Sequence, residues 1–285
     1  MKKVLKIFLW SVVVIMLILL GAGSLFIYKV KNGWPVSYET DIPAIEFPSD
    51  RKAVLLFSKS TGYRHSESIE AAKKAFANLA EKNNWFLYST EEGGVFNPEQ
   101  LGKFSAIVFN NSTGRVLNTD QQKALEQYVE QGGNLIGIHG TGDNSHPGWD
   151  WYNKSFVGVE FSHHPLAPQL QKATVVLNPV PDSTWIQNLV AEWEHTDEWY
   201  VFFENPRAKG FQVLYSIDGD KILPSGNIMF VKDKNFGMGK DHPVAWYHSV
   251  GKGQTFYTSI GHDAGAWKQE AFIQMLENAV QFEAQ

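Results

Sequence analysis

The sequence contains no cysteine among its 285 residues. This absence excludes disulfide bonds, thiolate metal sites, cysteine nucleophiles and lipid attachment through an amino-terminal cysteine. The absence of thiols is compatible with an oxidising compartment, but it is only permissive evidence for one.

Several sequence signatures are missing as well. The chain has no phosphate-binding loop, no dinucleotide fingerprint, no Gly-x-Ser-x-Gly elbow and no His-Glu-x-x-His helix. From Arg51 onward it also has no repeat, no low-complexity tract and no block of like charge. The sequence therefore predicts neither a nucleotide-dependent enzyme nor a serine hydrolase. Any metal site would need ligands brought together from distant segments.

The composition is that of a folded protein. Hydrophobic residues make up 44% of the chain, aromatic residues 14%, and the formal net charge is −5. Such a composition builds a substantial core in one large or two small domains, which excludes disorder. The mildly acidic balance argues against a nucleic-acid partner.

A long apolar segment lies at the amino terminus. Residues 7–28 carry no charge, three lysines precede them and two follow them. As a helix this segment would be about 33 Å long, enough to cross the apolar core of a bilayer. The positive-inside rule then places the remaining chain outside the cytoplasm, in the periplasm or at the cell surface. We therefore predict an anchor over residues 1–31.

Two alternatives remain for this segment. Gly21–Ser24 resembles the small-residue cleavage site of a secretory signal, in which case the protein is secreted after cleavage. The apolar continuation Leu25–Tyr28 favours an uncleaved anchor. A buried soluble helix is the third reading, but such helices rarely lack a polar face.

Residues 32–50 carry glycine and prolines without periodicity and are expected to form a linker or arm, followed by one domain over residues 51–285. Its first half alternates short apolar runs with amphipathic segments. We expect strands at 53–57, 85–88, 106–109 and 134–140, and helices at 66–79, with Ser66 as cap, and at 119–130. Apolar strands separated by helices predict an open α/β fold with a mostly parallel sheet.

The second half of the domain has a different pattern. Short β-prone runs occupy 174–177, 199–203, 212–217, 243–248 and 255–260, and a helix is expected over 267–282. We interpret this half as further sheet, insertions around the site and a final packing helix.

Histidines follow several of the predicted strands. His65 comes after the first, His139 ends the fourth between Gly137 and Gly140, and His262 follows the last. Because parallel strands end at one edge of an open sheet, these side chains should converge on one crevice. Each histidine alone is more simply a hydrogen-bonding residue, but three equivalent positions favour a base, an acid or metal ligands.

Other polar residues extend this candidate site. Glu198 is a candidate acid or ligand, and Asp263 could orient a histidine or simply form a turn. In the tandem His163-His164 only one ring can point inward if the segment is extended. Five tryptophans fall near these segments, each more simply core filling, but together they favour a carbohydrate ligand: Trp149, Trp151, Trp199, Trp246 and Trp267.

Six motifs carry a family resemblance. In chain order they are Thr61-Gly62-Tyr63-Arg64-His65-Ser66, Gly132–His139, Phe161-Ser162-His163-His164-Pro165, Thr196-Asp197-Glu198-Trp199-Tyr200, Pro243-Val244-Ala245-Trp246 and Tyr257–Asp263. From about Lys52 to Phe282 the chain resembles the trehalose-utilisation, ThuA-like, family, a branch of the class I glutamine amidotransferase-like superfamily. The resemblance implies a flavodoxin-like sheet with helices on both faces. His139 stands where the amidotransferases have a cysteine, so glutaminase activity is not implied.

The resemblance also implies a function. Family members are associated with trehalose and related disaccharides, at the stage of 3-keto sugars made by a partner sugar dehydrogenase. Carried over by motif, the pocket residues are His65, His139, His163, Glu198 and His262. Together with the residue analysis above, this makes His139, Glu198 and His262 the catalytic candidates, and His65, His163, Trp199 and Asp263 the substrate-binding candidates. A divalent metal is compatible with these residues. The anchor departs from a simple cytoplasmic enzyme.

The sequence thus gives one leading hypothesis and two rivals. The leading hypothesis is a lyase, hydrolase or isomerase of keto sugars, in which His139 is the base and Glu198 or His262 the acid. Its first rival is a membrane-anchored carbohydrate-binding protein without catalysis. The second is a metal-dependent hydrolase of ordinary glycosides, which is disfavoured because the adjacent Asp197 and Glu198 make a poor carboxylate pair.

Overall fold

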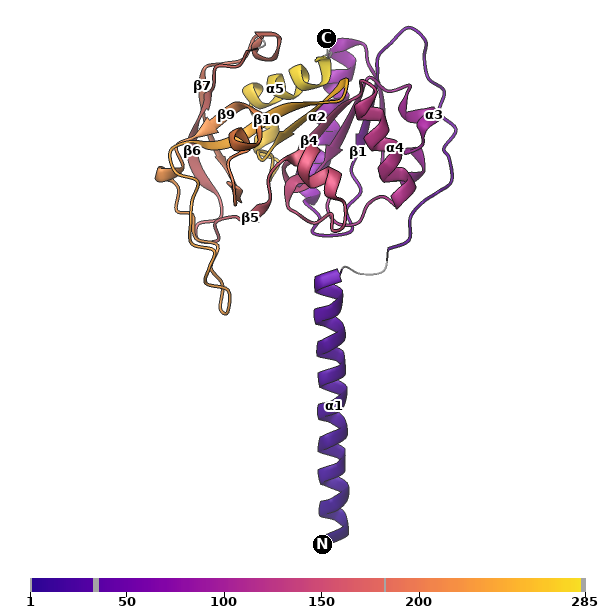
Figure 1. Ribbon diagram of the computed structural model, residues 1–285, viewed down its shortest axis with the longest axis vertical. Coiled ribbons are helices and arrows are strands. Elements are labelled where there is room, and N and C mark those ends of the chain that lie inside the picture. Colours follow the sequence, from indigo (N-terminus) through magenta and orange to yellow (C-terminus); the bar gives the residue numbers. More distant parts are fainter. Residues whose placement is uncertain (1, 33–35, 182, 283–285) are drawn as a thin grey trace. The chain divides into compact units, whose positions relative to one another are not determined.

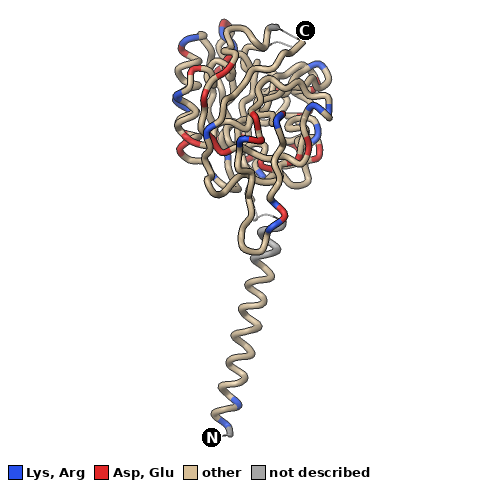
Figure 2. The backbone as a smooth tube through the Cα atoms, turned by 90° about the vertical axis from the view of Figure 1, so that its left-hand side faces the viewer, with Lys and Arg blue, Asp and Glu red and all other residues tan. Residues whose placement is uncertain are grey.

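The computed structural model describes residues 2–32, 36–181 and 183–282, which fall into two compact units, Met1–Ser37 and Tyr38–Gln285. The first unit consists of one helix, α1 (Lys2–Asn32). Within it, Lys3–Leu25 has a mean hydropathy of 2.7 and none of its side chains is buried. Figure 2 shows that charged residues in this stretch lie near its start. By length and composition, α1 is able to cross a membrane.

A nine-stranded sheet forms the second unit (Figure 1). Five adjacent strands are parallel, in the order β2-β1-β3-β4-β11. Their bounds are β1 Ala53–Phe57, β2 Phe86–Thr90, β3 Ala106–Asn110, β4 Asn134–Ile138 and β11 Gly253–Thr258. This order is that of a flavodoxin-like sheet, and the predicted α/β fold is confirmed.

Helices cover both faces of the parallel strands, which explains why these strands are apolar throughout. Val54 and Leu56 face one cluster of buried side chains, together with α2 (Ser66–Asn83) and α5 (Glu270–Gln281). Leu55 and Phe57 face the other, with α4 (Thr119–Glu130) and the short α3 (Pro98–Leu101). A π-helical turn over Tyr152–Val157 packs on this second face. The pairs alternate because successive strand residues point to opposite sides.

The remaining strands extend the sheet in antiparallel fashion, in the order β10-β9-β6-β7. They are β10 (His242–Val250), β9 (Gln212–Ile217), β6 (Gln171–Leu177) and β7 (Glu192–Asp197). A separate pair, β5 (Phe161–His163) and β8 (Val201–Phe202), lies beside them. Short 3₁₀ turns occupy Gly93–Val95, His139–Gly142, Ser183–Ile186, Pro206–Lys209, Gly219–Lys221 and Ala266–Lys268.

The sequence-based expectations are wrong at several boundaries. Strand β7 was not expected. It lies at the edge of the sheet, and its residues are therefore polar and half exposed, without the apolar pattern of a buried strand. The strand expected at 199–203 shrinks to β8, and the last helix begins at Glu270. Ser66 is the first residue of α2 rather than its cap, and no side chain caps this helix.

Residues 38–50 form an arm that packs on the domain rather than a free linker. Gln100 and Gln121 each donate a side-chain hydrogen bond to backbone carbonyls of this arm. The backbone of Asp41 passes so close to Gly94 that a β-carbon there would lie 1.9 Å from its carbonyl oxygen. Phe47 packs edge-on against Phe104, with ring centroids 5.0 Å apart. The arm therefore belongs to the folded domain.

Candidate active site

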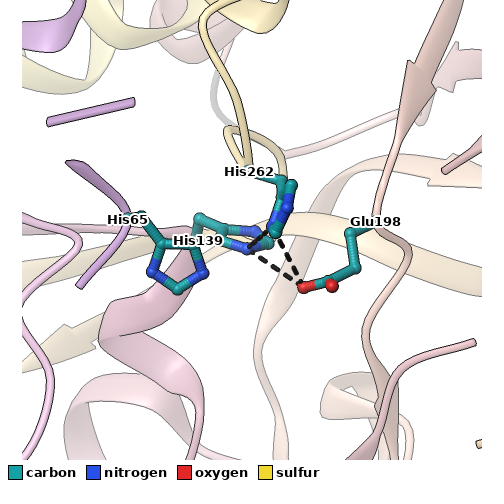
Figure 3. A group of neighbouring side chains, drawn as sticks. All are labelled: His65, His139, Glu198 and His262. Atoms are coloured by element: carbon teal, nitrogen blue, oxygen red, sulfur yellow. Dashed lines mark hydrogen bonds and ion pairs between the residues drawn. The ribbon is translucent and has the colours of Figure 1, made fainter. Parts of the chain in front are cut away.

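Four functional side chains meet at the carboxyl edge of the sheet (Figure 3). His65 follows β1, His139 follows β4, His262 follows β11, and Glu198 follows β7. The first three come from the parallel strands and the last from the antiparallel extension. Their ligand atoms all lie within 4.8 Å of one another. The structure therefore brings His65 together with all three residues that the sequence analysis assigned to catalysis.

Three of these side chains form a compact triangle of polar atoms. His139 Nε2 lies 3.4 Å from Glu198 Oε2, and His262 Nδ1 lies 3.2 Å from the same oxygen. The two imidazole nitrogens are 3.2 Å apart. Figure 3 shows His65 facing this triangle from the side of His139, and its ring centroid lies 4.8 Å from that of His139.

The backbone geometry of His139 aims its ring into the cluster. His139 has a φ of 45°, in the left-handed region that few residues other than glycine adopt. Its Nδ1 lies 2.6 Å from the Ser259 carbonyl oxygen, which only accepts, so Nδ1 carries the hydrogen. A neutral His139 therefore turns the lone pair of Nε2 toward Glu198 and His262.

Glu198 is held as a carboxylate. Its second oxygen, Oε1, lies 3.1 Å from His164 Nδ1 and accepts a hydrogen bond from Gln169 Nε2. Burial opposes its ionisation, but the imidazoles of His139 and His262, when protonated, outweigh burial and hold the pKa of Glu198 well below its usual range. An ionised Glu198 favours a role as ligand or charge partner over the role of general acid.

Asp197 fixes the loop that carries His262. It accepts hydrogen bonds from the backbone N–H groups of Glu198, Gly261 and His262, at 2.8, 2.8 and 3.1 Å. It also pairs with His195 at 2.9 Å. Burial opposes its ionisation, yet these partners lower the pKa of Asp197. Asp197 is thus a structural carboxylate and forms no catalytic pair with Glu198.

His65 and His262 titrate differently from one another. Burial, and then the charges of neighbouring imidazoles, lower the pKa of His65 to about 3. Its Nδ1 is buried and has no hydrogen-bond partner in the described part of the chain. Burial would also lower the pKa of His262, but its hydrogen bond with Glu198 and the charge of that carboxylate raise it. His65 is therefore neutral at pH 7, whereas His262 is the better proton donor.

The cluster opens into a pocket of about 320 Å³. Its walls are Tyr63, His65, Asp143, Phe161, His164, Gln169, Glu198, Tyr200 and His262. Burial raises the pKa of Asp143 to about 6, close to the range of an acid–base catalyst. The sequence analysis did not assign Asp143, Gln169 or Tyr200 to the site. Asp143 and Gln169 lie outside the six motifs, and Tyr200 lies in one of them without having been singled out. The tandem histidines gave the only sequence signal for His164.

Several predicted site residues lie elsewhere. His163 turns away from the pocket, and its Nε2 donates to the Pro224 carbonyl at 2.9 Å. Trp199 is fully buried and its indole N–H donates to the Gln171 carbonyl, so it has no face free for a sugar. Asp263 accepts the Gly265 N–H in a turn.

None of the five highlighted tryptophans lines the pocket. Four of them are buried in the hydrophobic clusters, and Trp151 packs against one of these clusters. The aromatic wall consists of Tyr63, Phe161 and Tyr200 instead.

The four clustered residues also suit a metal ion. Ligands at 2.0–2.2 Å around a tetrahedral zinc ion are separated by about 3.3–3.6 Å. The triangle of His139, His262 and Glu198 has sides of 3.2–3.4 Å, close to this spacing. When both imidazoles are neutral, His139 carries its hydrogen on Nδ1, outside the triangle. Of the three atoms of the triangle, only His262 Nδ1 can then carry a hydrogen. A cation between them, either a proton or a metal ion, would relieve the repulsion between the remaining lone pairs.

Comparisons with known proteins agree with this fold. A ThuA-like protein from Bacteroides uniformis is 23% identical, with a TM-score of 0.65 over 87% of this chain and 94% of that one. A ThuA-like protein from Parabacteroides merdae is 16% identical, with a TM-score of 0.60 over 82% and 90% of the two chains. No curated protein matches the chain. The family model described as trehalose utilisation matches residues 53–283. The chain therefore belongs to the ThuA family.

Proposed function

We propose that this chain is a membrane-anchored enzyme that processes a keto sugar, with a divalent metal ion held by His65, His139, Glu198 and His262. The observation that carries the proposal is the convergence of these four side chains within 4.8 Å of one another. His65, Glu198 and His262 line one pocket, and His139 is fully buried beside them. The description of the family as trehalose utilisation supports a disaccharide or a related glycoside as the substrate.

The surroundings of the cluster support metal binding. His139 donates its Nδ1–H to a backbone carbonyl, the arrangement that commonly orients a metal-binding imidazole. Gln169 and His164 hold one oxygen of Glu198 and leave the other facing the histidines. Asp197 fixes the backbone of Glu198 and His262. A bound ion would supply a Lewis acid that polarises a substrate carbonyl.

The pocket also offers groups for proton transfer. In a 3-keto glycoside the carbonyl acidifies the C2–H bond, and loss of this proton allows the C1–O bond to break, with the proton passing to the leaving alcohol. When its Nε2 is free, His139 is the base. When Nε2 is engaged by the ion, Asp143 takes this role, because it lines the pocket and its pKa is raised to about 6. Tyr63, Phe161 and Tyr200 would pack on the sugar ring.

We infer the location of the enzyme from the composition of α1. An uncleaved α1, with the lysine balance described above, would hold the domain in the periplasm or at the cell surface. A sugar dehydrogenase acting in the same compartment would supply the keto sugar.

The direct test is an NMR time course of the full chain in detergent with 3-keto-trehalose and with trehalose. The protein is first stripped of metal and then supplied with zinc or manganese. We expect conversion of the keto sugar but not of trehalose, and only after metal is restored. Cleavage of the C1–O bond is followed by the loss of the anomeric C1–H signals of the glycosidic linkage. Conversion that is unaffected by metal would reject the metal centre and keep the acid–base enzyme.

A matched pair of variants separates the site from general effects. His139→Ala should abolish turnover while the protein stays folded. His248→Gln replaces a half-buried histidine that packs on Phe211, outside the pocket, and should leave turnover unchanged. Normal turnover in His139→Ala would remove this residue from the mechanism.

A carbohydrate-binding protein without catalysis is the second candidate. The aromatic wall of the pocket favours it, since stacked rings alone can hold a sugar. Line broadening of sugar signals without conversion would support this candidate against the enzyme. A hydrolase with a carboxylate pair is less well supported, because Asp197 is engaged by the backbone.

A further inference from the structure

The loop between β9 and β10 ends in an exposed apolar hairpin over Ile228–Val231, which we call the apolar tip. Ile228 and Val231 exchange backbone hydrogen bonds of 2.9 and 2.7 Å, so Met229 and Phe230 form a tight two-residue turn. The side chain of Phe230 is 93% exposed and that of Met229 is 81% exposed. Figure 1 shows the loop projecting from the domain. Four consecutive exposed apolar residues at a loop tip are unfavourable in water.

The root of this loop is hydrogen-bonded to residues 162–171, a segment that also contributes to the pocket. Gln171 and Leu223 exchange two hydrogen bonds, each of 2.9 Å. The Pro224 carbonyl accepts from His163, and Lys234 donates to Ser162 Oγ at 3.1 Å. These anchoring residues belong to the segment that also carries His164 and Gln169. The residues at the root of the loop are therefore held by hydrogen bonds, while the apolar tip itself is exposed to solvent.

The loop leaves the sheet at the edge that residue Glu39 of the arm also contacts. It begins after the carboxyl end of β9, which runs in the same direction as β11. The arm contacts this edge through the ion pair of Glu39 with Lys59, two residues beyond the end of β1. Only residues 33–38 separate Asn32, the end of α1, from Glu39.

We propose that the apolar tip inserts shallowly into the surface of the membrane that α1 crosses. The inference rests on the membrane anchoring proposed above. A bilayer fits the size of the tip, because a standard protein–protein interface takes about 20–30 residues from each partner and the tip offers four. Apolar side chains enter the boundary between headgroups and acyl chains, while Lys232 beside them, which is exposed, can reach anionic headgroups.

Such a contact would give the domain a second point of attachment. Because the root of the loop is bonded to the 163–171 segment, insertion would also set the orientation of the pocket relative to the bilayer. The pocket would then face substrates that are present at the membrane surface.

The inference can be tested by site-specific fluorescent labelling. Because the chain contains no cysteine, a single introduced cysteine is the only thiol that can react with the label. The full chain is reconstituted in nanodiscs of zwitterionic and anionic phospholipid and labelled with an environment-sensitive fluorophore at Phe230→Cys. Lys252→Cys is the matched control, because this exposed residue lies at the opposite edge of the sheet, before β11. We expect blue-shifted emission at position 230, quenched several-fold more strongly by nitroxide lipids than at position 252.

A second pair of variants tests the apolar character of the tip. With the label at Met229→Cys, the further change Phe230→Asp should remove most lipid quenching, whereas Phe230→Leu should keep it. Both positions are exposed, so neither change disturbs the core.

The outcomes distinguish this inference from the proposed anchoring. A chain that stays in nanodiscs while the label at 230 is quenched no more than at 252 overturns the inference alone. A blue shift that resists lipid quenching and depends on a second copy of the chain overturns it in favour of a protein contact. A chain that does not remain with nanodiscs overturns the anchoring and the inference together.

Discussion

The two halves of the sheet contribute differently to the site. The parallel half supplies the three histidines of the cluster, since His65, His139 and His262 all follow its strands. The antiparallel extension supplies the carboxylate and its partners, since Glu198 follows β7 and Gln169 precedes β6. The parallel half is covered on both faces, whereas β7 is a polar edge strand. A protected scaffold thus positions the histidines, and a more exposed extension completes the charge of the site.

The largest effect is expected from removing the charge that the extension contributes. Glu198→Gln keeps the shape of the side chain but removes the charge that holds the cluster together. We expect kcat/KM for the keto sugar to fall by about 10³-fold and the affinity for zinc by at least about 100-fold. Steady-state kinetics and metal titration check this, with His248→Gln as control. If Glu198→Gln binds zinc as tightly as the wild type, the histidines alone are sufficient for zinc binding. The antiparallel extension would then contribute nothing to it, contrary to the comparison above.

The contrast between the halves should also appear in stability. Phe76 on α2 is fully buried beside Trp267, with ring centroids 6.2 Å apart, and Phe76→Ala should cost about 3–5 kcal/mol of unfolding free energy. Trp193 on β7 is half-buried and packs on Tyr215 at 4.5 Å, so Trp193→Ala should cost about 1–2 kcal/mol. Urea unfolding of the two variants measures the difference. Equal costs would show that the extension is as tightly packed as the parallel half.

The smallest effect concerns acid stability, which can be tested at one buried histidine outside the cluster in each half. His146 follows β4 and bonds the Ser112 carbonyl at 3.1 Å, and His242 opens β10 and bonds the Tyr200 carbonyl at 2.9 Å. Burial lowers the pKa of each to about 4. The unfolded chain, with a histidine pKa near 6.5, therefore binds more protons between pH 6.5 and 4. Stability should fall as the pH drops through this window, by about 1–2 kcal/mol for each histidine between pH 7 and 5.

Two variants check this acid sensitivity. His146→Gln and His242→Gln should each flatten the dependence of the unfolding free energy on pH between 7 and 5. An unchanged slope in both variants would assign the acid sensitivity to other groups.

The sequence predicted the parallel half and the edge of the sheet at which three of its histidines lie. Runs such as Ala53–Phe57 are apolar because both faces of their strands are covered, and this local signal survives without tertiary information. The same logic placed His65, His139 and His262 at one edge, since parallel strands end together. Strand β7 escaped prediction because an edge strand with polar residues lacks such a pattern.

Only the tertiary structure decided which polar side chains reach the pocket. In the structure His164 rather than His163 lines the pocket, and Asp143 lines it as well. Trp199 is buried, and the apolar tip is exposed. These choices depend on long-range contacts, such as the hydrogen bonds from Gly261 and His262 to Asp197, some 65 residues away. The sequence by itself therefore determined the scaffold and the edge at which the chemistry lies, because strand periodicity is local. The spacing of the cluster was decided by packing between segments that are distant in the chain.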